Sequence, residues 1–198
     1  MSRTFILLAL TLTLAACATT QAADKHLAPP SQAATDYYPL ASGWGWAYDL
    51  ERDGQTVLAV FSVTGNNGQT ATLLNAGESI IYEVLPEGIA RRDGGLMGDF
   101  LLKNPVVLGT RWTVFSGEAQ ITMVGKSVTL GTEVYTNCLV VEETRKDPTR
   151  ITRTTYAQGV GPIEIEMQVQ DPATKAFATT AHARLRGVTK PETGATEK

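Results

Sequence analysis

The chain has 198 residues with 17 basic and 20 acidic side chains, and its formal net charge at pH 7 is −3. This mild acidity argues against a nucleic-acid partner, because nucleic-acid binding normally requires a basic patch. The roughly 160 residues that follow position 36 suit one domain with a substantial hydrophobic core.

Residues 1–16 follow the order of a secretory signal peptide. Arg3 supplies a positive charge, residues 5–14 form an apolar run, and two small residues precede Cys17. The run is shorter than the roughly 20 residues that a membrane-spanning helix needs. Leu14 to Cys17 also resembles the bacterial lipobox, in which the cysteine is acylated and becomes the new amino terminus. We therefore predict a signal peptide over 1–16 and lipidation of Cys17; ordinary cleavage near Ala16 or Ala23 is the alternative.

The residue after the cysteine bears on the destination of the protein. In enterobacterial-type lipoproteins an aspartate at this position signals retention at the inner membrane, and this chain has Ala18 instead. By this resemblance we expect a protein that is anchored in the outer membrane by its lipid and faces the periplasm. Residues 17–36 are small, polar and proline-containing, which is typical of a flexible tether.

Beyond the tether, β-forming runs alternate with turn signals. Strands are predicted over residues 55–63, 69–74, 79–85, 111–115, 118–124, 127–130, 134–144, 150–157, 162–169 and 176–186. Asn67 and Gly68 tolerate positive φ and predict a type I′ hairpin turn. The glycine-rich residues 94–103 are expected to form a loop or a short helical turn.

The alternation of apolar and polar residues is clearest over 163–169, and one buried and one solvated face is typical of an antiparallel sheet. Roughly ten to twelve strands joined by short turns predict an all-β fold. We expect a single antiparallel meander domain over residues 37–188, forming a curved sheet, a half-barrel or barrel, or a sandwich. Residues 189–198 are expected to form a disordered tail.

Two segments share the spacing P-x3-G-x2-W. They are Pro39 to Trp46 and Pro105 to Trp112. Each combines a rigid proline, a glycine that can take positive φ, and a tryptophan where a strand begins. The pattern predicts a turn that directs a large aromatic side chain into the core. It reflects either an internal duplication or one turn solution used twice.

The first segment also carries a family resemblance. Residues 38–48, with the pattern Y-P-L-x2-G-x2-W-x-Y, resemble the opening of a group of uncharacterised bacterial envelope lipoproteins. Similar motifs follow in order over 101–112 and 131–138, and residues 156–161 match the closing Y-A-x-G-V-G. The family has no established activity, so the resemblance implies only a β fold and an envelope location.

No catalytic or metal-ligating constellation stands out, and we expect neither an enzyme nor a cofactor. Lipidation of Cys17 leaves Cys138 without an intramolecular partner, in an apolar strand pattern where it is expected to act as a small hydrophobe. His182 is interpreted as a sheet residue. Two further expectations concern charged residues. Glu164 and Glu166 are expected on a solvated outer face, and the charged residues 142–147 at a solvated strand edge.

Two functions remain open. The leading interpretation is a non-enzymatic, lipid-anchored envelope protein whose β domain binds a protein partner or supports outer-membrane assembly. The alternative is a carrier or sensor of a lipid or another hydrophobic small ligand, held in the cup of the curved sheet. The candidate ligand-binding residues are Trp44, Trp46, Trp112, Tyr82 and Phe61, which could instead fill the core.

Overall fold

The computed structural model describes residues 29–93, 96–115, 117–146 and 149–191. One short helix, α1 (Ala34–Tyr37), precedes an all-β domain. The strands are β1 (Gly45–Arg52), β2 (Gln55–Asn66), β3 (Thr70–Asn75), β4 (Glu78–Leu85), β5 (Gly88–Asp93), β6 (Leu96–Lys103), β7 (Arg111–Val114), β8 (Gly117–Leu130), β9 (Glu133–Lys146), β10 (Thr149–Ala157), β11 (Gly161–Gln170) and β12 (Phe177–Thr189).

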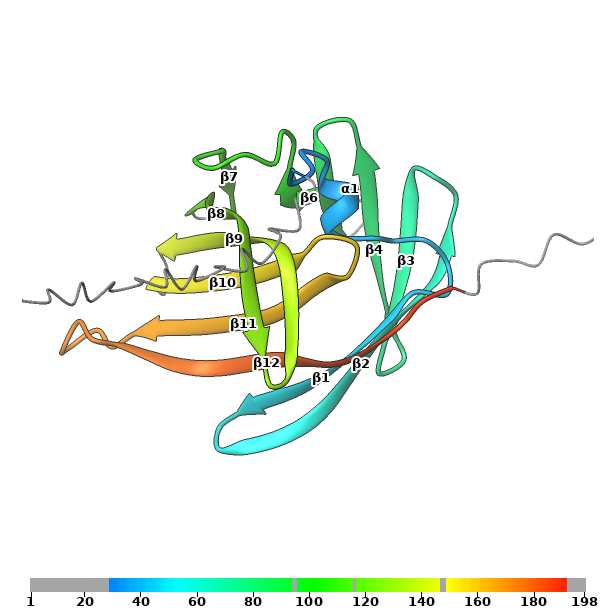
Figure 1. Ribbon diagram of the computed structural model, residues 1–198. Coiled ribbons are helices and arrows are strands. Elements are labelled where there is room, and N and C mark those ends of the chain that lie inside the picture. Colours follow the sequence, from blue (N-terminus) through cyan, green and yellow to red (C-terminus); the bar gives the residue numbers. More distant parts are fainter. Residues whose placement is uncertain (1–28, 94–95, 116, 147–148, 192–198) are drawn as a thin grey trace, which may run out of the picture.

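The strands form one antiparallel meander that is nearly closed into a barrel. Their order is β6-β5-β4-β3-β2-β1-β12-β11-β10-β9-β8-β7, so each half of the chain is a six-strand meander. A ladder between β1 and β12 joins the halves, with Trp46 opposite Val188 and Leu50 opposite Ala183. In Figure 1 the two halves curve toward each other around a common interior. The predicted all-β antiparallel meander is confirmed, and among the predicted forms the barrel describes it best.

Side chains bridge the seam where the barrel is not closed by a strand ladder, between β6 and β7. The Trp112 ring donates from Nε1 to the Phe100 carbonyl oxygen over 2.9 Å. The Asp99 carboxylate accepts the Phe115 backbone N–H at 2.7 Å and the Arg145 guanidinium at 2.9 Å. Asp99 therefore links β6 both to the end of β7 and to β9.

Three sequence-based expectations about the strands are corrected. Residues 96–103 form strand β6, although a loop or helical turn was expected over 94–103, and strand β5 before it was not predicted. The predicted strands 118–124 and 127–130 are one strand, β8, whose pairing with β9 shifts register on both sides of Val124. The β2–β3 turn lies where Asn67 and Gly68 placed it, but of these two residues Gly68 alone takes positive φ, so the turn is not type I′.

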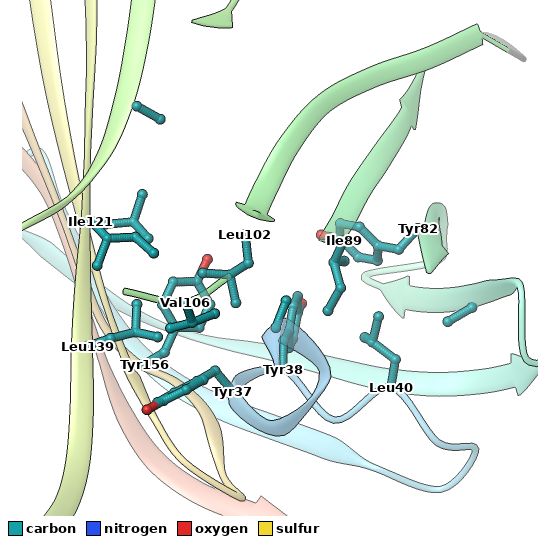
Figure 2. Close-up of a cluster of buried hydrophobic side chains, with 14 of the residues drawn as sticks. Tyr37, Tyr38, Leu40, Tyr82, Ile89, Leu102, Val106, Ile121, Leu139 and Tyr156 are labelled. Atoms are coloured by element: carbon teal, nitrogen blue, oxygen red, sulfur yellow. The ribbon is translucent and has the colours of Figure 1, made fainter. Parts of the chain in front are cut away.

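One end of the barrel is covered by the segment that includes α1. Antiparallel order places the β6–β7 and β10–β11 loops at the same end, and this segment is bonded to both. The Val106 N–H donates to the Gln32 carbonyl, and the Gly159 N–H donates to the Asp36 carbonyl. Figure 2 shows Tyr37, Tyr38 and Leu40 packed among Leu139 and Tyr156 on one side and Tyr82 and Ile89 on the other.

Residues 31–36 were expected to belong to the flexible tether, and this part of the prediction is wrong. Ala34 is fully buried, and its N–H donates to the Asn104 side-chain oxygen over 2.8 Å. The polar composition of the segment gave no indication of this role, because its partners are loops seventy or more residues away in sequence. We call this covered end of the barrel the closed end, and the opposite end the mouth.

The two P-x3-G-x2-W segments form the same turn. Gly43 and Gly109 both have φ of +89°, and each N–H donates to the adjoining strand, to Val63 in one case and to Ile121 in the other. The two turns then introduce β1 and β7, the first strands of the two six-strand halves. Trp46 and Trp112 are both buried, as the pattern predicted.

Candidate functional site

The interior of the barrel is closed at its base by four tyrosines. The Tyr38 ring lies 5.4 Å from that of Trp46, 5.7 Å from that of Tyr82 and 6.2 Å from that of Tyr156, measured between ring centroids. Tyr48 donates its phenol hydrogen to the Pro162 carbonyl over 2.8 Å. Burial raises the pKa of Tyr38, Tyr48 and Tyr156 above the ordinary value, so all three phenols stay neutral at physiological pH.

An apolar cavity of about 270 Å³ lies inside the barrel above this base. We call it the lumen cavity. Its wall comes from six strands of both halves: Tyr48, Leu50, Ala59, Phe61, Asn75, Thr152, Ile165, Met167, Ala181 and Ala183. The register explains the set, because directly opposed residues share one face of a sheet: Tyr48 pairs with Ala59, and Leu50 pairs with Ala183. Three small alanines, Ala59 on β2 and Ala181 and Ala183 on β12, leave this space unfilled.

A second, charged cavity of about 370 Å³ adjoins the seam between β6 and β7. Five of its residues form what we call the arginine cluster: Arg91, Asp99, Glu143, Arg145 and Arg150. The two cavities share a wall, because Thr152 of the lumen cavity is the direct cross-strand partner of Glu143. The inner surface of the barrel thus passes from apolar to charged within one strand pair.

Arg145 is the best-compensated charge of the cluster. Its guanidinium contacts Asp99 at 2.9 Å and also hydrogen-bonds Glu143, and the three side chains are each less than a third exposed. Burial by itself lowers the pKa of Arg145, but the hydrogen bonds and charges of Glu143 and Asp99 outweigh it and raise that pKa. The predicted solvated edge over 142–147 is therefore wrong for Glu143 and Arg145, which line a cavity.

Arg150 differs from Arg145 in having no such compensation. Its Nε is buried and has no hydrogen-bond partner among the described residues. Arg150 is also the direct cross-strand partner of Arg145, which places two like charges opposite each other. Such a pair destabilises a sheet, and a buried donor without a partner costs further free energy.

The five aromatic residues predicted from the sequence lie in three places. Trp46, Trp112 and Tyr82 are buried in the core, and the Trp46 Nε1 donates to the Val160 carbonyl at 2.7 Å. Phe61 lines the lumen cavity. Trp44 is only partly buried, stacks on Trp46 and carries the Lys190 ammonium 5.5 Å from the centroid of its ring.

Of the remaining sequence candidates, Cys138 and His182 line neither the lumen cavity nor the charged cavity. Cys17 is outside the described residues. Cys138 is fully buried beside Ala157 and Ile163, and burial raises its pKa to about 11, so it is an unreactive thiol at neutral pH. His182 contacts Glu164 at 2.8 Å on the opposite sheet face from Ala181 and Ala183, which line the lumen cavity.

Glu166 also belongs to this outer face. It accepts hydrogen bonds from Gln168 and Thr179, and Arg153 lies 3.6 Å away. Burial opposes the shift, but the hydrogen bonds and the nearby charge lower the pKa of Glu166. Among the described residues, no group of three or more histidine, cysteine or acidic side chains is placed to hold a metal ion, and no helix is long and apolar enough to span a membrane.

Sequence reasoning missed most of the lumen cavity and the whole arginine cluster. The alternation over 163–169 did identify Ile165 and Met167 as facing away from solvent. The alanines and arginines carried no such signal, because their position depends on register between strands far apart in the chain. To find which residue lies opposite each inward-facing side chain, one must know the strand order, and the sequence alone does not give it.

Comparisons with known proteins place the chain in no family. No protein-family model matches it, and no curated protein matches it. A solved structure from Bacteroides fragilis, a candidate exported protein with a YmcC-like fold, resembles it with a TM-score of 0.47 and 12% sequence identity over 78% of this chain and 99% of that one. A likeness this distant carries no argument about function, and the family resemblance of the motifs stays a prediction.

Proposed function

We propose that this chain is a lipid-anchored protein of the bacterial outer membrane whose barrel binds a hydrophobic small ligand in the lumen cavity. The signal-peptide pattern and the lipobox-like residues up to Cys17 support the location. The lumen cavity is the observation that carries the binding function, because it leaves part of the interior unfilled, as in the larger β-barrels that enclose ligands.

The chemistry of the cavity favours an apolar guest. Of the ten residues that line it, Asn75 and Thr152 are polar, and Tyr48 is polar at its hydroxyl, which is already bonded to Pro162. Small-molecule sites are mostly apolar with few polar groups and occupy roughly 300–1,000 Å³, so the lumen cavity, at about 270 Å³, lies just below this range.

The test uses the full chain carrying Cys17→Ser, purified without detergent and freed of bound lipid. We expect this chain to bind the neutral dye N-phenyl-1-naphthylamine with increased fluorescence, and 1-dodecanol to displace the dye. Ala183→Leu adds three carbon atoms inside the lumen cavity and abolishes the dye signal. Ala173→Leu is the matched control, because it adds the same atoms to an exposed loop and leaves the signal unchanged.

Two outcomes contradict this proposal. The first is dye binding that Ala183→Leu and Ala173→Leu affect equally, which places the dye elsewhere. The second is an absence of any dye binding by a chain whose urea unfolding shows that it is folded. Ala181→Leu is a second cavity variant, because Ala181 lines the same space from β12. Loss of the dye signal in both variants shows that the filled cavity is the cause, and not a local distortion specific to Ala183→Leu.

A protein partner remains the second candidate function. Leu58 is 58% exposed and Val60 50% exposed, and both lie on the outer face of β2, opposite Asp49 and Ala47 of β1. Neighbouring exposed apolar side chains on one sheet face are typical of interaction surfaces. A photo-crosslinking residue at position 58 should then capture one specific protein in intact membranes, whereas the same residue at position 173 should not; equal capture at both positions contradicts this function.

A further inference from the structure

The arginine cluster contains more positive than negative charge. Three arginines and two carboxylates line the charged cavity. Asp99 and Glu143 both contact Arg145. Neither carboxylate is therefore directed to Arg150, the cross-strand partner of Arg145. The barrel thus keeps two opposed arginines on its inner face and neutralises one of them.

Arg150 occupies a place where an uncompensated cation is costly. Its Nε is buried and has no hydrogen-bond partner in the part of the chain that the structure describes, although most buried donors in folded proteins have one. A guanidinium is suited to phosphate or carboxylate, because its planar N–H groups match two oxygen atoms at once. An anion bound by the Arg150 guanidinium in the charged cavity relieves the repulsion between the two arginines.

The lumen cavity lies next to this position. Arg150 and Thr152 face the same side of β10, and Thr152 belongs to the wall of the lumen cavity. Arg150 is nearer to the mouth, since β10 begins at Thr149 and runs toward the closed end. A ligand with an apolar chain and a charged end can therefore place its chain among Ile165 and Met167 and its charged end beside Arg150.

We propose that the arginine cluster binds the anionic head group, a phosphate or a carboxylate, of an amphipathic ligand whose apolar chain occupies the lumen cavity. This inference rests on the proposed function and adds the chemical class of the ligand to it. Arg150 supplies the recognising guanidinium. Arg145 is held by Asp99 and Glu143 and adds positive charge at the same point.

The experiment compares three ligands that share a twelve-carbon chain: dodecanoate, dodecyl phosphate and 1-dodecanol. Each is titrated against N-phenyl-1-naphthylamine bound to the full Cys17→Ser chain. We expect at least one of the two anions to bind roughly ten- to a hundredfold more tightly than the alcohol, the range of a charge-assisted hydrogen bond. The ranking of dodecyl phosphate against dodecanoate identifies which head group the site prefers.

Arg150→Gln is expected to remove this preference for the anions and to leave the affinity for 1-dodecanol unchanged. Arg153→Gln is the matched control, because Arg153 lies on the same strand but bonds Glu142 and Glu166 on the outer face. An anion preference that survives Arg150→Gln, or is lost equally in Arg153→Gln, overturns the inference.

The failures of the two proposals differ. Equal affinity for all three ligands overturns the anionic head group and leaves the hydrophobic carrier intact. Failure of all three to displace the dye, 1-dodecanol included, contradicts the carrier itself and the inference with it. Urea unfolding of each variant confirms that a lost signal reflects the site and not the fold.

Discussion

Arg145 and Arg150 face each other across β9 and β10, yet replacing them by methionine should change stability in opposite directions. Arg150→Met removes a like-charge pair and a buried Nε for which the described residues offer no hydrogen-bond partner, and it places an apolar chain near the lumen cavity. Arg145→Met keeps Arg150 but takes the shared cation away from Asp99 and Glu143. The second change also weakens the side-chain bridge across the β6–β7 seam.

The magnitudes follow from these contacts. A like-charge cross-strand pair costs roughly 0.2–1 kcal/mol and an unsatisfied buried donor roughly 1–3 kcal/mol, and partial exposure of the site favours the lower values. Arg150→Met should therefore raise the free energy of unfolding by about 1 kcal/mol. Arg145→Met loses charge-assisted hydrogen bonds to two carboxylates and should lower it by about 2–3 kcal/mol, with partial exposure again limiting the cost.

Urea denaturation of the ligand-free Cys17→Ser chain measures both changes, with tryptophan fluorescence as the signal because Trp46 and Trp112 are buried. The two variants differ in unfolding free energy by about 3–4 kcal/mol, so their thermal midpoints should differ by about 6–16 °C, since each kcal/mol shifts the midpoint by about 2–4 °C in a domain of this size. The reasoning is refuted if Arg150→Met destabilises the protein as much as Arg145→Met does. That result means that Arg150 already has a stabilising partner.

Three further predictions concern other parts of the chain. Burial raises the pKa of Cys138 from 9.0 to about 11, so the thiol of the unfolded chain loses its proton at a lower pH than the thiol of the folded chain. The contribution of Cys138 to the free energy of unfolding is therefore complete below pH 9 and falls by about 1.4 kcal/mol per pH unit toward pH 11. Urea unfolding between pH 8 and pH 11 should show a shallower decline in Cys138→Ala than in the parent, and equal slopes contradict the assignment. Gly161→Ala should cost about 2–3 kcal/mol, because φ is +111° and the new Cβ lies 2.7 Å from the Trp46 Nε1, whereas Gly159→Ala, with φ of +70° and open space, should cost about 1 kcal/mol. Cys17→Ser should abolish incorporation of labelled palmitate and move the chain from the outer-membrane to the soluble periplasmic fraction; continued labelling places the lipid on another residue.

Strands were predictable wherever the pattern of one strand was sufficient. The alternating Ile163, Ile165 and Met167 of β11 mark an inward face without knowledge of any neighbour. β5 and β6 lacked this pattern because their polar residues are compensated by other strands. Arg92 bonds Glu83 of β4 at 3.0 Å, and Asp99 of β6 bonds Arg145 of β9. Such pairs make charged residues compatible with a sheet, but they become visible only with the strand order.

The candidate site could not be predicted from the sequence for the same reason. Phe61 was identified among the aromatic candidates, but bulk alone did not separate it from Trp46 and Trp112, whose ring nitrogens bond backbone carbonyls in the core. The space beside Phe61 exists because Ala59 and Ala183 are small. An alanine in a strand carries no signal of a cavity until the residues opposite it are known.

We infer different roles for the two opposed arginines: Arg145 stabilises the barrel, and Arg150 binds the ligand. Arg145 is bonded to Asp99, which in turn accepts the Phe115 N–H across the seam, so Arg145 is part of what keeps the barrel closed. Among the described residues, Arg150 makes no hydrogen bond or ion pair to Asp99 or Glu143, so its substitution leaves the side-chain contacts of the seam in place. Of the two, Arg150 can therefore be changed without opening the barrel, and for this reason loss of anion binding in Arg150→Gln can be separated from loss of the fold.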